Sequence, residues 1–250
     1  MAEPIIRDES DGVVTLTLNR PEKLNALTAE MFRALRGHLD DVAARPEEVG
    51  CVILTGAGRS FCAGKDLSEV GPRPHAEEEA VAGTIDLLES IPQPTIGAVR
   101  GHCYTGGLEL LLACDLIVAS DTAVFADTHA RFGLVAGLGM SVRLPERVGA
   151  MRAREMMFTA RPVAAAEAQA IGLVTRVVDD AELEESVAAM AAQIVANSWH
   201  THRAYKALMG GDRTAGRGEA LARVLRREFG RDSNYSKRVA AFGDRREERR

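Results

Sequence analysis

The sequence lacks the features that would assign it at once to several broad classes. No apolar run approaches the roughly 18 residues that a membrane-spanning helix needs. The first residues have neither the basic nor the apolar region of a signal peptide. A net charge of −5 at pH 7 provides no basic surface for nucleic acid. We therefore expect a cytoplasmic protein that binds neither membranes nor nucleic acids.

Cysteine is scarce as well, and its spacing gives no sign of a metal site. No two of the four cysteines form a CxxC pair, which disfavours zinc and thioredoxin-like redox sites. Without an export signal the thiols are expected to stay reduced and to pack as small buried side chains. They are Cys51, Cys62, Cys103 and Cys114.

Nucleotide-binding loops are missing too. The segment 55–66 (TGAGRSFCAGKD) contains the glycines and the lysine of a phosphate-binding loop. However, the gap between Gly58 and Gly64 is one residue too long, and Asp66 stands where Ser or Thr would bind magnesium. We interpret the segment differently: the glycine-flanked Lys65 could offer its backbone N–H to an oxyanion. A plain surface turn is the alternative.

Strands alternate with helices in the first half of the chain. Strands are predicted where apolar residues alternate or run continuously between turn residues, and Thr28 is predicted to cap a helix. This alternation predicts an α/β fold with a parallel or mixed sheet. The predicted strands are 13–18, 49–55, 95–99, 116–119 and 123–126, and helices are predicted after Thr28, up to Ser90 and over 107–114.

From about Gly137 the pattern changes to alanine-rich helical periodicity. Apolar helices without a further sheet often pack on a neighbouring subunit. We therefore divide the chain into a core at 1–195 and a C-terminal helical oligomerisation region at 196–250. Helices are predicted at 152–158, 164–170, 181–197, 200–209 and 218–229, with one short strand at 173–178.

The most informative segment is Gly106-Gly107-Leu108-Glu109, which opens an apolar helix. Glycine lets a ligand approach the backbone closely, and the first N–H groups of a helix lack partners within it, so they can bind an oxyanion. The apolar run 110–114 leaves Glu109 little water, which raises the pKa of a carboxylate toward that of a working acid or base. Donor and acid/base group within one turn suit chemistry at a carbonyl. In the loop before them, His102 and Tyr104 could shape a pocket or simply pack.

Six stretches of the chain, in this order and spacing, resemble the enoyl-CoA hydratase/isomerase family, also called the crotonase superfamily. The resemblance runs from about Val13 to Phe242, which is nearly the whole chain. The matching stretches are RPEKLNAL at 20–27, LTG at 54–56, FCAGKDL at 61–67, GGLEL at 106–110, CD at 114–115 and GLV at 172–174.

The resemblance implies a spiral of ββα units with a C-terminal helical trimerisation region, and homotrimers that pair into hexamers. It also implies an acyl-CoA substrate, so that coenzyme A belongs to the substrate and neither a separate cofactor nor a metal is expected. The thioester oxygen would be held by the N–H groups of Lys65 and Gly106. The other residues implied to contact coenzyme A are Lys23, Leu24, Ala26, Ala63, Asp66, Leu67 and Ser68, with Phe242 and Arg245 reaching the coenzyme A of a neighbouring subunit.

The chain departs from the family at a position that decides the chemistry. Typical hydratases of the family carry a second glutamate 20 residues after the one that matches Glu109, and here that position is His129. An imidazole could replace the glutamate as the acid/base group, or it could line the pocket without transferring a proton. In a shifted register the carboxylate would come from Asp127, which otherwise resembles a turn-capping residue. Ala136 replaces a usual proline in the following loop.

We therefore predict an enoyl-CoA hydratase that adds water to a 2-enoyl-CoA and forms 3-hydroxyacyl-CoA through an enolate-like anion. Glu109 would act as the base on water, and protonated His129 would deliver the α-proton. Three alternatives keep the same fold. They are double-bond isomerisation, another acyl-CoA reaction such as hydrolysis, and a catalytically silent acyl-CoA-binding protein.

Overall fold

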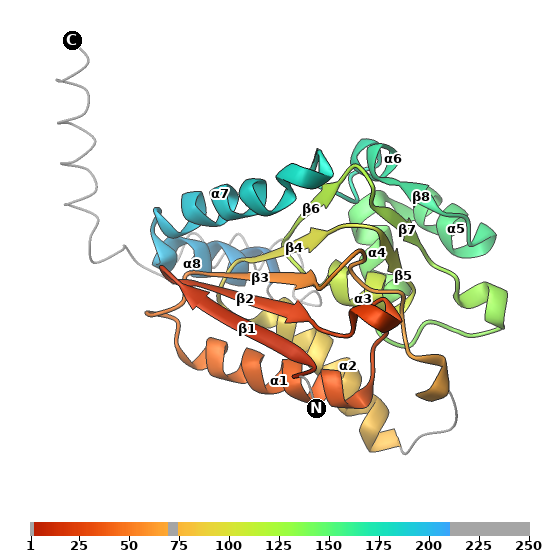
Figure 1. Ribbon diagram of the computed structural model, residues 1–250, viewed down its shortest axis with the longest axis horizontal. Coiled ribbons are helices and arrows are strands. Elements are labelled where there is room, and N and C mark those ends of the chain that lie inside the picture. The colour runs from red at the N-terminus through yellow and green to blue at the C-terminus, as the bar shows by residue number, and fades with distance from the viewer. Residues whose placement is uncertain (1–2, 70–74, 211–250) are drawn as a thin grey trace, which may run out of the picture. The chain divides into compact units, whose positions relative to one another are not determined.

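The computed structural model describes residues 3–69 and 75–210 (Figure 1). The chain separates into two compact units, with the boundary after Val195. The described part of the second unit contains the helix α8 (Trp199–Gly210). The predicted helix 218–229 and the predicted coenzyme A contacts Phe242 and Arg245 lie outside the described residues.

A six-stranded sheet forms the centre of the first unit. Its strands follow the order β1-β2-β3-β4-β6-β9, and each neighbouring pair is parallel except β1 and β2. The β1–β2 hairpin turns at Asp11 and Gly12, whose φ values of 52° and 76° suit a two-residue turn. The strands are β1 (Ile5–Ser10), β2 (Val13–Leu18), β3 (Cys51–Gly56), β4 (Thr95–Val99), β6 (Leu116–Ser120) and β9 (Arg176–Val178).

Helices cover both faces of this sheet (Figure 1). α1 (Ala29–Ala44) and α2 (His75–Ser90) pack on the side to which Leu54 points, whereas α7 (Leu183–Val195) packs on the side of Ile53. Because both faces are buried, β3 is a continuous apolar run rather than an alternating one. The predicted cap of α1 is confirmed, since the hydroxyl of Thr28 accepts a hydrogen bond from the N–H of Met31 at 3.2 Å.

A second, three-stranded sheet has the order β5-β7-β8. Its strands are β5 (His102–Tyr104), β7 (Val124–Ala126) and β8 (Val163–Ala164). The prediction that His102 and Tyr104 lie in a loop is wrong, because β5 pairs in parallel with β7. Strands of two or three residues are too short to show an alternating pattern, so only their pairing reveals β5 and β8.

Four further helices surround these sheets: α3 (Gly106–Leu112), α4 (Met140–Val148), α5 (Ala150–Thr159) and α6 (Ala165–Ala170). α4 escapes sequence analysis because Gly139 precedes it and Pro145 lies inside it, and both residue types usually interrupt helices. Short 3-10 turns complete the chain path: η1 (Pro21–Lys23), η2 (Leu67–Glu69), η3 (His129–Phe132) and η4 (Asp180–Glu182).

These elements confirm the predicted α/β class. The spiral of ββα units and the C-terminal trimerisation region stay predictions. All four cysteines are buried and free, as expected of small core side chains. Within 3–69 and 75–210, no helix combines the length and the apolar character needed to cross a membrane.

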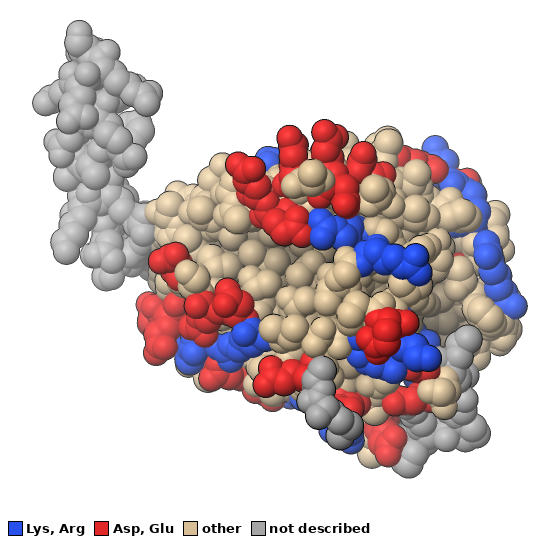
Figure 2. Space-filling view, in the orientation of Figure 1, with Lys and Arg blue, Asp and Glu red and all other residues tan. Residues whose placement is uncertain are grey.

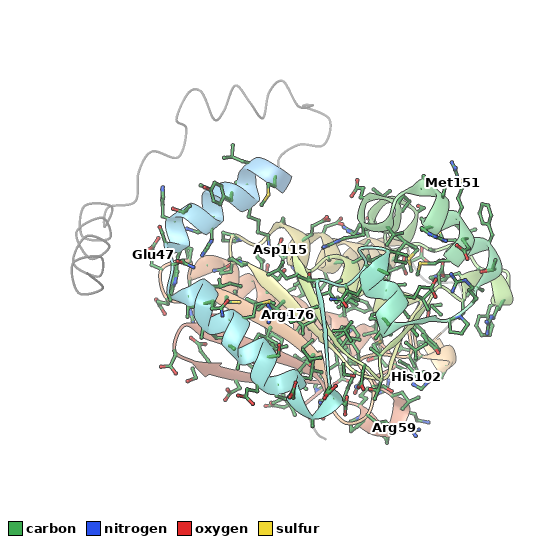
Figure 3. The ribbon with its side chains drawn as sticks, turned by 90° about the horizontal axis from the view of Figure 1, so that it is seen from above. Glu47, Arg59, His102, Asp115, Met151 and Arg176 are labelled. Atoms are coloured by element: carbon green, nitrogen blue, oxygen red, sulfur yellow. The ribbon has the colours of Figure 1, made fainter. Side chains whose placement is uncertain are left out.

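Asp115, which is labelled in Figure 3, connects the segment after α3 to the main sheet by hydrogen bonds. Its Oδ2 accepts hydrogen bonds from the backbone N–H of Thr95 at 2.8 Å and from the Thr95 hydroxyl at 2.9 Å. The N–H of Asp115 donates in turn to the same hydroxyl. This reciprocal pair joins the start of β4 to the turn before β6, and so it sets the position of α3 against the sheet.

The surface carries charges of both signs. On the face drawn in Figure 2, basic side chains are interspersed with acidic ones. The acidic side chains of η4 and of the first turn of α7 gather at one end of that helix, where Arg100 pairs with Asp180 and Glu184. No extended basic stripe crosses the face in this view.

Candidate active site

The helix α3 carries two residues of the candidate site, Gly106 and Glu109. All of its residues are buried, and it begins at Gly106, one residue earlier than predicted. Gly107 has no room for a side chain, because a Cβ there would lie 2.7 Å from Cys62 Cβ and 2.8 Å from the Cys62 carbonyl oxygen. This contact lets α3 pack directly on the segment that leads to Lys65.

Glu109 lies in the first turn of α3 and is only 1% exposed. Its Oε1 accepts hydrogen bonds from the backbone N–H of Leu138 at 2.8 Å and of Met140 at 3.2 Å. Met140 is the first residue of α4, so its N–H has no partner inside that helix. Burial raises the pKa of Glu109, although the two N–H groups and the charge of His129 oppose the shift.

His129 stands beside the free oxygen of this carboxylate. Its Nε2 lies 3.7 Å from Glu109 Oε2, too far for a direct hydrogen bond. Its Nδ1 lies 2.5 Å from Asp127 Oδ1, and its backbone N–H donates to the same oxygen at 3.1 Å. Burial lowers the pKa of His129, but the hydrogen bond to Asp127 and the charges of Asp127 and Glu109 together raise it above the usual value.

Asp127 thus makes the contact expected of a turn-capping residue and also touches the imidazole. The structure places His129 next to Glu109 and places Asp127 behind the ring. The two acid/base candidates from the sequence therefore meet in one site, although they lie on different elements.

The backbone N–H groups of Lys65 and Gly106 belong to two segments that contact each other. Leu27 pairs with the chain on both sides of Lys65: its N–H donates to the carbonyl of Gly64, and its carbonyl accepts from the N–H of Asp66. In such a parallel bridge the N–H of Lys65 faces away from Leu27. A Cβ on Gly106 would lie 3.6 Å from the Lys65 nitrogen.

In the part of the chain that the structure describes, neither the N–H of Lys65 nor that of Gly106 donates a hydrogen bond. Free backbone donors on two segments in contact are the kind of group that can bind one oxygen carrying negative charge. The structure therefore places the two predicted oxyanion donors on segments that contact each other, and their role stays a prediction.

The buried side chain of Asn25 joins the segment that precedes Leu27 to the segment 57–60. Its Nδ2 donates to the carbonyls of Ser60 at 2.7 Å and Ala57 at 2.9 Å, and the residue has a φ of 55°, in a region that asparagine tolerates. The N–H of Ala63 donates to the carbonyl of Leu24 at 2.9 Å. The structure therefore brings together four of the predicted coenzyme A contacts, namely Lys23, Leu24, Ala26 and Ala63.

Asp66 holds the neighbouring loop instead of pointing freely outward. Its Oδ1 accepts from the hydroxyl of Ser68 at 2.7 Å and from the Ser68 N–H at 3.0 Å, and its Oδ2 accepts from Arg20 at 2.9 Å. The hydrogen bonds of Ser68, followed by that of Arg20, lower the pKa of Asp66 to about 2. Arg20 also donates to the carbonyl of Ala26. Leu67 lies with Ser68 in η2.

His102 and Tyr104 make the contacts of packed side chains. His102 lies near Arg59 (Figure 3), and its Nδ1 is 3.1 Å from the hydroxyl of Ser60. Its ring meets that of Tyr104 edge to face with centroids 5.1 Å apart. Burial raises the pKa of Tyr104.

Arg143 is a part of the site that sequence analysis missed. This arginine of α4 is 7% exposed, and it forms ion pairs with Asp86 and Glu89 of α2. It also donates to the carbonyl of Leu138 at 2.9 Å. Arg143 therefore ties the loop whose N–H groups hold Glu109 to a second helix. No pattern within a few residues predicts this, because the partners come from α2.

The next question is whether side chains of the described residues cluster as metal ligands do. Within 3–69 and 75–210, no group of three or more His, Cys, Asp or Glu side chains could hold a metal ion. The chemistry that the geometry offers is acid/base transfer by Glu109 and His129 next to two backbone donors.

The sequence of the chain is similar to that of known proteins. A family model described as enoyl-CoA hydratase/isomerase matches residues 8–247. The chain is 38% identical over 200 residues to an Arabidopsis thaliana protein named "Probable enoyl-CoA hydratase 1, peroxisomal", a match that covers 77% of this chain and 72% of that protein.

Solved structures share the fold. A crystal structure of an enoyl-CoA hydratase from Bacillus anthracis superimposes with a TM-score of 0.91 at 30% identity, covering 97% of this chain and 96% of that one. A Thermobifida fusca protein whose structure is titled as a complex with CoA superimposes with a TM-score of 0.78 at 32% identity, covering 90% of this chain and 94% of that one.

Proposed function

Because the chain belongs to the enoyl-CoA hydratase/isomerase family, we propose that it is a hydratase that converts a 2-enoyl-CoA into a 3-hydroxyacyl-CoA. One observation carries the proposal. Glu109 Oε2 and His129 Nε2 lie 3.7 Å apart, so two acid/base groups stand together beside a pair of free N–H donors. Addition of water across a double bond needs a base for the water and an acid for the α-carbon.

The proposed reaction begins with the thioester oxygen bound by the N–H groups of Lys65 and Gly106. Glu109 takes a proton from water as the oxygen of that water bonds to the β-carbon, and the electron pair of the double bond moves onto the thioester. The two N–H groups stabilise the resulting enolate-like anion. The imidazolium of His129 then protonates the α-carbon.

The two groups return to their starting states by exchanging one proton. After turnover Glu109 is protonated and His129 is neutral. The gap of 3.7 Å between Oε2 and Nε2 is short enough for a single water molecule to relay the proton. Burial of both groups opposes this transfer, because it lowers the pKa of His129 and raises that of Glu109, whereas the hydrogen bond and charge of Asp127 raise the pKa of His129 and favour it.

Binding of the coenzyme A portion is proposed for the two neighbouring segments that hold Lys23 to Ala26 and Ala63 to Ser68. The Thermobifida fusca structure titled as a complex with CoA supports this class of ligand. Assembly into homotrimers or hexamers through 196–250 stays a prediction, and so do the roles of Phe242 and Arg245 and the cytoplasmic location. The Arabidopsis thaliana relative is named as peroxisomal.

The test is an assay of purified protein with crotonyl-CoA, in which loss of ultraviolet absorbance reports loss of the conjugated thioester. We expect absorbance to fall and mass spectrometry to find a product heavier by one water. With His129→Ala the rate should fall by roughly 10²- to 10⁴-fold. If the absorbance of crotonyl-CoA still falls at the wild-type rate with His129→Ala, Glu109 would be the main catalytic group and His129 would only line the pocket.

Other outcomes of the assay point to the alternatives. Conversion of a 3-enoyl-CoA to a 2-enoyl-CoA without any hydroxyacyl product would replace the hydratase proposal with isomerisation. Release of free CoA thiol would indicate hydrolysis. Binding of crotonyl-CoA with none of these products would identify a silent acyl-CoA-binding protein.

Arg143→Leu is expected to lower kcat by roughly 10-fold and the free energy of unfolding by about 1–3 kcal/mol. The reason is that the carbonyl of Leu138 loses its donor, and the loop that presents two N–H groups to Glu109 loses its ties to α2. Steady-state kinetics and chemical denaturation measure the two effects.

The matched control is Arg152→Leu, which removes an exposed ion pair with Glu155 on α5. Such surface pairs contribute about 0–1 kcal/mol, so this variant should behave like the wild type. An Arg143→Leu variant with wild-type kcat would show that the loop is held without the arginine.

A further inference from the structure

Asp127 stands out among the acidic residues of the molecule because it is buried. In the part of the chain that the structure describes, Asp127 and Glu109 are the only carboxylates buried below a few per cent exposure, at 2% and 1%. A buried carboxylate is costly unless its hydrogen bonds compensate. The contacts that compensate Asp127 both come from one residue, His129.

The two contacts share a single oxygen. The backbone N–H of His129 donates to Asp127 Oδ1 at 3.1 Å, and this bond fixes the carboxylate at the end of β7. The ring Nδ1 lies 2.5 Å from the same Oδ1. Because an ionised carboxylate only accepts hydrogen bonds, Nδ1 must carry a proton. Nε2, opposite Glu109 Oε2, is then the nitrogen left to exchange a proton.

We infer that Asp127 is a positioning residue, which holds the His129 ring with Nδ1 protonated so that Nε2 faces Glu109 and alone gives or takes the proton in catalysis. The catalytic part of this inference rests on the proposed function. The orientation and protonation of the ring do not, since they can be measured without any substrate.

The charge of Asp127 also affects the pH range in which the ring of His129 is protonated and can act as an acid. Burial of the ring favours the neutral form, whereas the hydrogen bond and charge of Asp127 and the charge of Glu109 favour the imidazolium and raise the pKa on balance. The guanidinium of Arg131, which lies in the same 3-10 turn as His129, donates to the carbonyl of Ala160.

The helix α5 packs on η3 and carries charged residues of its own. They are Arg152, Arg154 and Glu155, and Arg152 and Glu155 pair with each other. Asp127 and Glu109 are the groups whose charges raise the pKa of His129 against the effect of burial.

Asp127→Asn separates this role from that of a turn cap. The amide oxygen of asparagine can accept both hydrogen bonds, so the cap and the ring orientation remain while the negative charge is lost. The pKa of His129 should therefore fall, and the alkaline limb of the kcat/KM profile should move to lower pH. At pH 8 we expect kcat/KM to fall roughly 10- to 100-fold, less than the loss from removing a general acid outright.

The substrate-free readout is nitrogen NMR of protein labelled in its histidine rings. The six histidines are sorted by comparison with His129→Gln, whose spectrum lacks one ring. In the wild type above its pKa, we expect His129 to be protonated at Nδ1. In Asp127→Asn its titration should shift to lower pH, while the exposed control Asp121→Asn should leave it unchanged.

Three results would overturn the inference. A neutral His129 protonated at Nε2 in the wild type would do so without any variant, even if Asp127→Asn failed to fold. An unchanged titration of His129 in folded Asp127→Asn would reduce Asp127 to a turn cap. An altered titration with an unmoved kcat/KM profile would show that Asp127 acts on a ring that catalysis does not use. Absence of hydratase activity in the wild type would contradict the proposed function but would leave the NMR result as the test of the ring.

Discussion

Glu109→Gln is expected to lower kcat by roughly 10²- to 10⁴-fold while leaving the Kd for an acyl-CoA ester almost unchanged. Glutamine has the same shape, and its Oε1 can still accept the N–H groups of Leu138 and Met140. The variant lacks only the ability to take a proton from water. Stopped-flow or steady-state absorbance with crotonyl-CoA measures kcat, and calorimetric titration with a saturated acyl-CoA measures binding.

The stability of the same variant gives an independent check. Burial raises the pKa of Glu109, which means that the protein holds the charged form at a cost. Removing the charge should leave the melting temperature unchanged or slightly higher. Glu78→Gln, at an exposed position of α2, serves as the matched control. Wild-type kcat in Glu109→Gln would contradict the role of Glu109 as the base.

Alanine substitutions at the two adjacent glycines of α3 should have different effects: Gly106→Ala should lower activity, and Gly107→Ala should lower stability. Gly106→Ala places a methyl group 3.6 Å from the Lys65 nitrogen, an ordinary van der Waals contact, and under the proposed function this methyl group would crowd an oxygen bound to the two N–H donors. We expect kcat/KM to fall by as much as the roughly 10²- to 10³-fold seen when an oxyanion donor is lost. The fold should persist, and the loss of glycine should if anything favour the helix.

Gly107→Ala should instead destabilise the fold. Its methyl group would lie within 2.8 Å of three Cys62 atoms, including the carbonyl oxygen, so the helix or the 61–65 segment must shift. Overpacking of this kind costs typically about 1–3 kcal/mol of the free energy of unfolding. Chemical denaturation of both variants with parallel kinetics tests the pair. Equal stability with equal loss of kcat/KM would contradict the division of roles between the two glycines.

Much of the architecture could be predicted from local patterns. The alternating residues of β2, the cap of α1 at Thr28 and the apolar strand β4 all appear where the sequence analysis expects them. Such patterns depend on neighbours a few residues apart, because side-chain periodicity and capping are local effects. The burial of Glu109 followed in the same way from the apolar residues around it in α3.

Elements without a local pattern were missed. β1 has one buried residue, Ile5, so its alternation is hidden, and β5 and β8 are too short to show any. α4 contains Pro145 and follows Gly139, both of which argue against a helix in a sequence taken alone. In each case strand pairing or packing in the folded chain outweighed the local preference.

The same division holds in the candidate site. Residue types and their order predicted Glu109 and the N–H groups of Lys65 and Gly106 as functional groups, and the resemblance to the family predicted a role for His129 at the position of a second glutamate. The N–H groups that hold Glu109 come from Leu138 and Met140, 29 and 31 residues further on. Their loop is tied by Arg143 to carboxylates of α2 more than 50 residues away. Such partners are set by packing between elements, which local spacing does not encode. Folding therefore decided that Nε2 of His129 faces Glu109 while Asp127 stands behind the ring.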